Sequence, residues 1–185
     1  PDTSGRWILG RSHTAWSYGD PNSTLRTETQ TYYDGEPFIG MNLGSLDQGN
    51  VTRVTVKKEV GSDEVIAAAR NRYDDHGNVI ETIDPNGVIG GNTHRRVYVM
   101  DEDQLRVRQT DIWLEDPDGN PYTLRRETQY EPVFDRVVET TAWMRTEGDT
   151  LMSPRRSTFF GYAVFGRLSA RVLPGGDTLE SPTKS

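Results

Sequence analysis

The sequence contains no cysteine, and this absence removes three kinds of chemistry at once. A chain of 185 residues without cysteine has no disulfide, no thiolate metal site and no cysteine nucleophile. Histidine is nearly absent too, because His13, His76 and His94 are the only three and none has a second histidine at ligand spacing. No Gly-x-Ser-x-Gly elbow positions a serine nucleophile. We therefore expect no catalytic residue, no metal and no cofactor.

Hydrophobic residues are scarce, at 33% of the chain with a mean hydropathy of −0.73. No run of eighteen apolar residues occurs, so no membrane span is expected, and residues 1–5 do not form a signal peptide. Disorder would explain this composition, but Thr, Val, Tyr and Trp recur in alternating runs. The 18 glycines and 10 prolines supply tight turns between short strands. The composition predicts a folded all-β protein.

Positive charge is also in deficit, since 28 acidic residues against 21 basic ones give a net charge of −7. Such a balance repels nucleic acid and anionic membranes, so we expect neither as a partner. Basic pairs occur at Arg95-Arg96, Arg125-Arg126 and Arg155-Arg156. Neighbouring residues in a strand point to opposite faces, so these pairs are expected to meet acids such as Glu127 or Glu139 rather than form one patch.

Strand signals are dense along the chain and helix signals are almost absent. Extended segments are predicted at residues 6–18, 25–33, 50–60, 64–70, 93–100, 105–115, 121–130, 137–146, 157–162 and 167–172. Turns are predicted at residues 20–22, 75–78, 84–87, 116–120, 147–149 and 174–176. Within residues 50–60, Thr52, Val54 and Val56 share one side, which is predicted to be apolar. The pattern predicts antiparallel β-hairpins.

The run from Tyr73 to Gly87 returns in altered form from Tyr162 to Gly176. Tyrosine, first glycine, aliphatic residue, proline and last glycine keep the same spacing in both copies. Weaker copies begin at Tyr98 and at Tyr130, so the starts lie at positions 73, 98, 130 and 162, which are 25, 32 and 32 residues apart. Periods of this length predict stacked units in which no hairpin buries its apolar face alone.

The motif Tyr73-Asp74-x-x-Gly77, followed by Asp84-Pro85-x-Gly87, resembles the YD repeat of RHS proteins. These proteins form spiralling β-sheet shells in bacteria, and related repeats occur in animal teneurins. Residues 32–44, which include Tyr33-Asp34-Gly35, and residues 49–53 are similar to a stretch of the B-type shell subunit of bacterial insecticidal toxin complexes. The chain departs from the family pattern after Tyr98, Tyr130 and Tyr162, where the aspartate is replaced or displaced.

The resemblance implies a non-catalytic wall segment, a curved and twisted sheet within a larger shell that sequesters a variable C-terminal toxin. Its implied partners are the rest of the shell, the toxin cargo and a toxin-complex C-type subunit, in a bacterial toxin that is secreted or exported. The residues of the repeat motif would be Tyr33, Asp34, Gly35, Tyr73, Asp74, Gly77, Asp84, Pro85, Gly87, Tyr130, Arg136, Tyr162, Gly166, Arg167, Pro174 and Gly176.

We expect one domain over residues 1–185, with N-terminal hairpins in residues 5–60, repeats in residues 61–176 and a polar tail in residues 177–185. A start without methionine and the polar end indicate a fragment of a longer chain. The outer strands of such a segment would be open edges, which favours an edge-to-edge homodimer.

Two other functions stay open. Trp7, Trp16, Tyr18, Trp113 and Trp143 could stack on sugar rings if they were exposed, as in a carbohydrate-binding β-module. RHS proteins also contain an aspartyl autoprotease, and by that resemblance Asp84 and Asp116 could form a carboxylate pair. A metal interpretation of Asp74-Asp75-His76 or of Asp116–Gly119 is less favoured than turn chemistry, because the residues after Gly119 lack the ligands of a calcium loop.

Overall fold

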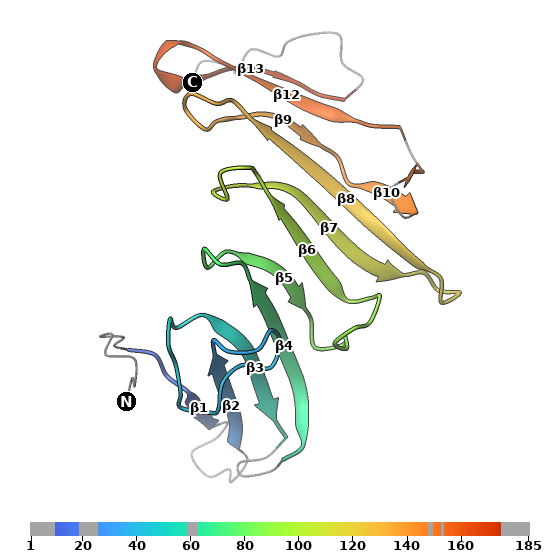
Figure 1. The fold of residues 1–185 in the computed structure, drawn as a ribbon. Helices are drawn as coiled ribbons and strands as arrows, with labels where there is room; N and C mark the ends of the chain where they lie inside the picture. The colour runs from blue at the N-terminus through green and yellow to red at the C-terminus, as the bar shows by residue number, and fades with distance from the viewer. Residues whose placement is uncertain (1–9, 19–25, 59–62, 148–149, 153, 175–185) are drawn as a thin grey trace. The chain divides into compact units, whose positions relative to one another are not determined.

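The computed structural model describes residues 10–18, 26–58, 63–147, 150–152 and 154–174 (Figure 1). The predicted turn at residues 20–22, Trp7, Gly176 and the predicted tail at residues 177–185 lie outside these described residues. Every described element is a β-strand apart from one 3-10 turn at Val164–Gly166, and the strands pair in antiparallel fashion. The all-β prediction is therefore confirmed. The chain divides into two compact units, residues 1–96 and residues 97–185.

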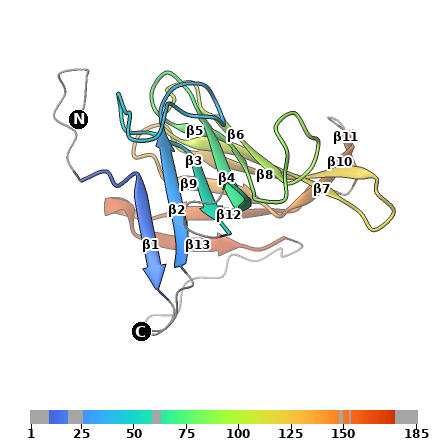
Figure 2. The same cartoon turned by 90° about the horizontal axis from the view of Figure 1, so that it is seen from below.

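In the first unit, five strands follow one another in chain order, and each pairs with the next. They are β1 (Thr14–Tyr18), β2 (Arg26–Tyr33), β3 (Val51–Lys57), β4 (Val65–Tyr73) and β5 (Val79–Ile83). Figures 1 and 2 both show β1 and β2 side by side at one edge. β6 (Arg95–Met100) carries the chain across the division between the units. The strand predicted at residues 64–70 is confirmed as β4.

The second unit contains the seven remaining strands. They are β7 (Val107–Glu115), β8 (Pro121–Tyr130), β9 (Val137–Thr141), β10 (Met144–Glu147), β11 (Thr150–Leu151), β12 (Ser157–Tyr162) and β13 (Leu168–Val172). Strands β7, β8, β9, β12 and β13 are neighbours in that order, as Figure 1 shows, while β10 pairs with β8 and β11.

The strand predicted at residues 137–146 is broken into β9 and β10. Both halves pair with β8: β9 lies opposite Thr128–Tyr130, and β10 lies opposite Thr123–Arg125. Between them, the backbone N–H of Ala142 donates to the carbonyl of Arg156 at 2.7 Å, which turns the chain out of the β8 ladder. The prediction of one continuous strand was wrong because alternation alone does not reveal such an interruption in the pairing with β8.

The buried face of these strands is mostly polar. Only Tyr33, Ala68, Ile83 and Met144 are buried hydrophobic side chains among the described residues. The buried polar ones are Glu28, Gln30, Thr52, Thr55, Glu81, Asp111, Thr141, Thr146 and Thr158. Val54 and Val56 stay partly exposed, so the side predicted to be apolar is not one continuous dry face.

The buried polar side chains are stabilised by hydrogen bonds to one another. The Gln30 amide donates to the Glu28 carboxylate at 2.6 Å, and the Tyr32 hydroxyl donates to Gln30 at 2.7 Å. The Arg53 guanidinium lies 3.9 Å from the centre of the Tyr32 ring. Polar groups can be buried when they are hydrogen-bonded, so these strands bury polar side chains without a thick apolar layer. In the described part of the chain, no helix has the length and apolar character needed to cross a membrane.

Candidate functional site

Four tyrosine hydroxyls each bond a backbone carbonyl of a neighbouring segment, which is the first residue of β3, β7 or β9 in three cases and Ser12, two residues before β1, in the fourth. Tyr33 donates to Ser12 at 2.7 Å, Tyr73 to Val51 at 2.7 Å, Tyr130 to Val107 at 3.2 Å and Tyr162 to Val137 at 2.8 Å. Each tyrosine is the last residue of its strand, β2, β4, β8 or β12. We call these the four tyrosine–carbonyl bonds. They give the sequence repeat a physical purpose, because each one fastens the end of a strand to its neighbour.

Tyr98 does not take part in this arrangement. It lies inside β6, which continues to Met100, and the turn begins at Asp101. The weak repeat start predicted at Tyr98 is therefore wrong by two residues. Met100, the last residue of β6, occupies the position that tyrosine has in the other copies. The spacing of 25 residues from Tyr73, shorter than the other two intervals, was the sequence signal for this irregularity.

Tyr73 is suited to act as a permanent donor. Burial raises the pKa of its phenol, and the nearby Asp34 charge raises it further, while bonds from Asn71 and to Val51 act in the opposite direction. The net shift is upward, so the hydroxyl keeps its proton at neutral pH.

Replacing Tyr73 or Tyr130 by phenylalanine is expected to lower the free energy of unfolding by about 1 kcal/mol each, because one hydrogen bond is lost and a carbonyl is left without its donor. Tyr98→Phe is the matched control and is expected to change it by less than about 0.5 kcal/mol. Urea unfolding followed by circular dichroism measures all three. Equal losses in the three variants would show that the tyrosine–carbonyl bonds add no stability.

Two turns share the sequence Asp-x-x-Gly-Asn and the same set of bonds. The Asp74 N–H donates to the Asn78 carbonyl at 3.0 Å, and the Asp116 N–H to the Asn120 carbonyl at 3.0 Å. In each turn the aspartate Oδ1 accepts from the N–H groups two and four residues on, at 2.8 to 3.0 Å. Gly77 and Gly119 adopt φ of 85° and 84°, which glycine takes without strain. The predicted turn chemistry of both aspartates is confirmed.

The turn that begins at Asp84 is longer but closes in the same way. The Asp84 N–H donates to the His94 carbonyl at 3.0 Å, its Oδ1 accepts from the Asn86 N–H at 2.8 Å, and its Oδ2 lies 3.3 Å from His94 Nδ1. A Cβ on the buried Gly87 would lie 2.9 Å from the His94 carbonyl oxygen, so this position has no room for a side chain. Pro85 is exposed.

The carboxylate of Asp34 closes the longest loop, which connects β2 and β3. It accepts four backbone N–H groups, from residues 47, 48, 49 and 50, at 2.7 to 2.9 Å. The Asp34 backbone is in the left-handed region at φ 48°, followed by Gly35 at φ 69°. Burial alone would raise the pKa of Asp34, but the four donors outweigh it and the pKa is lowered. The group is therefore an anion that organises a loop.

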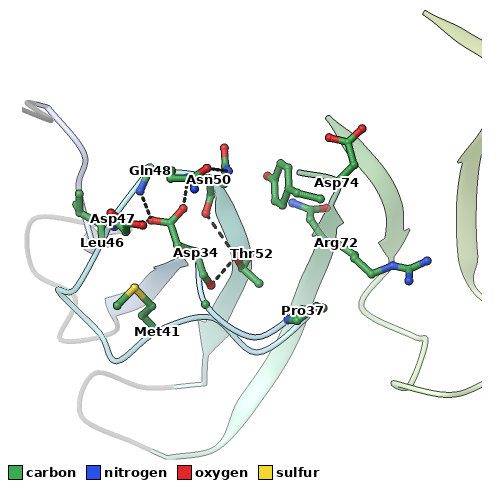
Figure 3. A pocket seen from close by; sticks show the side chains of 13 residues that line it. Asp34, Pro37, Met41, Leu46, Asp47, Gln48, Asn50, Thr52, Arg72 and Asp74 are labelled. Carbon is green, nitrogen blue, oxygen red and sulfur yellow. Dashed lines mark hydrogen bonds between the residues drawn. The ribbon is translucent and has the colours of Figure 1, made fainter. Parts of the chain in front are cut away.

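A cavity of about 490 Å³ opens beside this loop (Figure 3). Its lining is mixed: Pro37, Met41 and Leu46 from the loop are apolar, and Asn71, Arg72, Tyr73 and Asp74 come from the end of β4 and the turn after it. Of the three carboxylates that line it, those of Asp34 and Asp74 are already bonded to backbone N–H groups and have lowered pKa values. Neither is suited to donate a proton at neutral pH.

Stability should fall in acid because the turn carboxylates bind protons more readily in the unfolded chain. The pKa values of Asp34, Asp74, Asp101 and Asp116 are all lowered from the ordinary value of 3.8. Their contribution is complete above that value and is lost as pH falls through the lower folded pKa. The midpoint of urea unfolding is expected to drop between about pH 4 and pH 2. A midpoint unchanged over that range, or a drop equally steep in Asp34→Asn, would contradict this.

Ion pairs hold the polar face together. Glu81 is only 3% exposed and pairs with Arg72 at 2.8 Å and with Arg95. Asp111 pairs with Arg125 through two bonds of 2.9 and 3.0 Å. Arg155 bridges Glu127 at 2.8 Å and Glu139 at 3.0 Å. The expectation of acidic partners, Glu127 and Glu139 among them, is confirmed for one arginine of each basic pair, namely Arg95, Arg125 and Arg155.

Arg106 was not predicted from the sequence, although it has three acidic partners, Asp101, Asp103 and Asp135. Its guanidinium bonds Asp101 at 2.6 Å and Asp135 at 2.5 Å, and lies 5.1 Å from the centre of the Tyr130 ring. Arg136 has a similar setting in the turn between β8 and β9, where it bonds Glu131 at 2.8 Å and lies 4.7 Å from the Tyr162 ring centre. The shared spacing of an acid five residues before an arginine could have revealed both.

The remaining residues of the predicted motif are dispersed. Gly166 adopts φ of 78° in the turn before β13, and Arg167 and Pro174 are exposed. Asp84 and Asp116 lie in different units, each bonded within its own turn. Among the described residues, no group of three or more His, Asp or Glu side chains could hold a metal ion. Trp16 is 55% exposed and Trp143 is 44% exposed.

Comparison with known proteins adds no family to this geometry. A scan against protein-family models matches none, and a search of curated proteins finds no significant match.

Proposed function

We propose that this chain is a structural segment of a β-sheet wall that encloses a polypeptide cargo. The observation that carries the proposal is the set of four tyrosine–carbonyl bonds, which recur at equivalent strand ends. A bond that recurs at the ends of β2, β4, β8 and β12 suits a sheet that grows by adding hairpins, since each bond fastens one strand end to a neighbouring segment. The similarity of residues 73–87 to the YD repeat of shell-forming proteins points the same way.

The state of the titratable groups supports a structural role. Asp34, Asp74 and Asp116 are anions fixed by backbone donors, and Tyr73 is a protonated donor. Acid–base catalysis needs groups whose protonation changes near the pH at which the protein acts. These groups instead keep one protonation state, because they bond to the turns and strands that they stabilise.

The paired charges of the buried polar face suit enclosure. A wall around an unfolded chain must not bind it tightly, and contiguous apolar patches would do so. Here the buried face carries charged groups that already pair with each other, such as Glu81 with Arg72 and Asp111 with Arg125. Charged groups that are paired in this way are not free to bind a cargo.

Protease protection tests the proposal in the native polypeptide that carries this segment. An enclosed cargo region is expected to survive protease while exposed wall turns such as residues 116–120 are cut, and to become sensitive once urea opens the sheet. Digestion of every other part of that polypeptide at the rate of the isolated cargo would overturn the proposal. So would a native polypeptide that contains no further segment to enclose.

A carbohydrate-binding module is the second candidate, and the exposure of Trp16 and Trp143 favours it. Exposed indole rings can stack on sugar rings. A glycan array with the intact chain should then show selective binding that Trp16→Ala or Trp143→Ala reduces at least tenfold. Binding that both variants retain would eliminate this candidate.

Self-cleavage by an aspartyl pair has less support, because Asp84 and Asp116 each accept hydrogen bonds within a separate turn. Its test is incubation of the purified chain: two fragments that Asp84→Asn abolishes would favour it. An intact chain after prolonged incubation would count against it.

A further inference from the structure

The last described strand, β13, presents an open edge. Among the described residues β13 pairs only with β12, so the backbone groups on its other side have no strand partner there. Its first residue, Leu168, is 38% exposed, and the preceding Arg167 is exposed. Strand edges of this kind accept an added strand.

Two junctions inside the same unit show what an added strand looks like when it is in place. In the first, Arg106 ends a turn, Val107 begins β7, and Tyr130 at the end of β8 bonds the Val107 carbonyl while its ring lies beneath Arg106. In the second, Arg136 ends a turn and Val137 begins β9. Tyr162 at the end of β12 bonds the Val137 carbonyl, with its ring beneath Arg136.

Arg167 ends the turn before β13 and Leu168 begins the strand, as at the two junctions, but no tyrosine among the described residues bonds the Leu168 carbonyl. The direction of the Leu168 carbonyl follows from that of the preceding residue, Arg167, by comparison with Arg136 and Val137. The Arg136 carbonyl accepts from Glu131 N–H at 2.9 Å and the Arg167 carbonyl from Ala163 N–H at 2.8 Å, so both face their own turn. Backbone groups of successive strand residues point to opposite edges, which aims the carbonyl of Val137 at Tyr162 and that of Leu168 at the open edge.

Charge specifies the partner further. Arg106 and Arg136 each bond a carboxylate at the start of their own turn, Asp101 and Glu131, whereas the turn before Arg167 starts with Ala163. No described residue forms an ion pair with Arg167. Arg106 also bonds Asp135, which lies in the turn after β8, the strand that ends in Tyr130. A carboxylate in that position on an added strand would reach Arg167.

We propose that the edge of β13 binds an antiparallel strand of another polypeptide that ends in tyrosine and is followed by a turn carrying a carboxylate. The tyrosine hydroxyl donates to the Leu168 carbonyl, its ring packs beneath the Arg167 guanidinium, and the carboxylate pairs with that guanidinium. The proposal shares the tyrosine–carbonyl geometry with the proposed function but does not depend on enclosure of a cargo.

The probe is a synthetic peptide of residues 121–136, which holds Tyr130 and Asp135 in the required order. Titrated into the isotopically labelled intact chain, it is expected to shift the amide signals of Arg167 and of β13 selectively. A peptide with Tyr130→Phe is expected to bind about fivefold more weakly, since one hydrogen bond is lost. Arg167→Gln in the protein should weaken binding of the original peptide about as much, by removing the cation–π contact and the ion pair.

Arg171→Gln is the matched control, because it removes the same charge from an exposed position on β13. It should leave binding within about twofold. The proposal is overturned if millimolar peptide shifts no β13 signal, if the Tyr130→Phe peptide binds equally well, or if Arg171→Gln weakens binding as much as Arg167→Gln. Self-association of the chain at β13 that Arg167→Gln does not affect would overturn it too. None of these results bears on protease protection, so the two proposals fail separately.

Discussion

Replacing Glu81 by alanine is expected to lower the free energy of unfolding by about 3 kcal/mol or more. The Glu81 side chain is 4% exposed and lies between Arg72 and Arg95 on the polar face of the first unit. Removing it leaves two guanidinium groups facing each other with no anion between them, and the lost attraction is replaced by repulsion. Urea unfolding followed by circular dichroism measures the change.

Glu64→Ala is the matched control, because Glu64 pairs with Lys58 at 3.1 Å where both side chains are more than half exposed. An exposed pair contributes at most about 1 kcal/mol, so this variant should stay close to the parent. If Glu81→Ala loses no more stability than Glu64→Ala, the buried pairs are not what holds this face together. A Glu81→Gln variant should fall between the two, since the amide keeps one acceptor oxygen.

Replacing Asp34 by alanine is the second large effect we expect, also about 3 kcal/mol. Four backbone N–H groups lose their common acceptor, and hydrogen bonds to a charged group contribute about 1.5–3 kcal/mol each before solvent replaces some of them. The loop between β2 and β3 should lose its order first, and the cavity beside it should open. Amide hydrogen exchange of residues 47–50 reports this directly, with faster exchange expected in the variant.

Asp47→Ala serves as the control for Asp34→Ala. Asp47 lines the same cavity, but no hydrogen bond to its carboxylate is present among the described residues. Its replacement should leave the exchange of residues 48–50 unchanged within about twofold. Equal acceleration in both variants would mean that loss of local charge, rather than loss of the Asp34 acceptor, loosens the loop.

The strand pattern could be predicted from the sequence because it depends on local signals. Alternating residues and turn residues such as Gly77 and Gly119 act over a few positions, and nearly every predicted segment that falls on described residues forms a strand. The break between β9 and β10 could not be predicted in this way, since it depends on which part of β8 each half meets. The register in which each half pairs with β8 leaves no local spacing rule in the sequence.

Parts of the candidate site could also be predicted from the sequence. The repeat pointed to Tyr73, Tyr130 and Tyr162, and the structure gives these residues equivalent bonds. Asp116–Asn120 and Asp74–Asn78 share the pattern Asp-x-x-Gly-Asn, which predicts a turn at both places, and both form one. The role of Asp34 was not readable, because its donors lie 13 to 16 residues away across a loop with no regular pattern.

The scarcity of buried apolar side chains bears on how this protein responds to heat. Unfolding that exposes little hydrocarbon raises the heat capacity only slightly, because polar surface contributes with the opposite sign. The resulting stability curve is shallow, with no sharp optimum near room temperature and little tendency to unfold in the cold. For such a protein, acidity and salt concentration are stronger controls of folding than temperature over the range in which cells live.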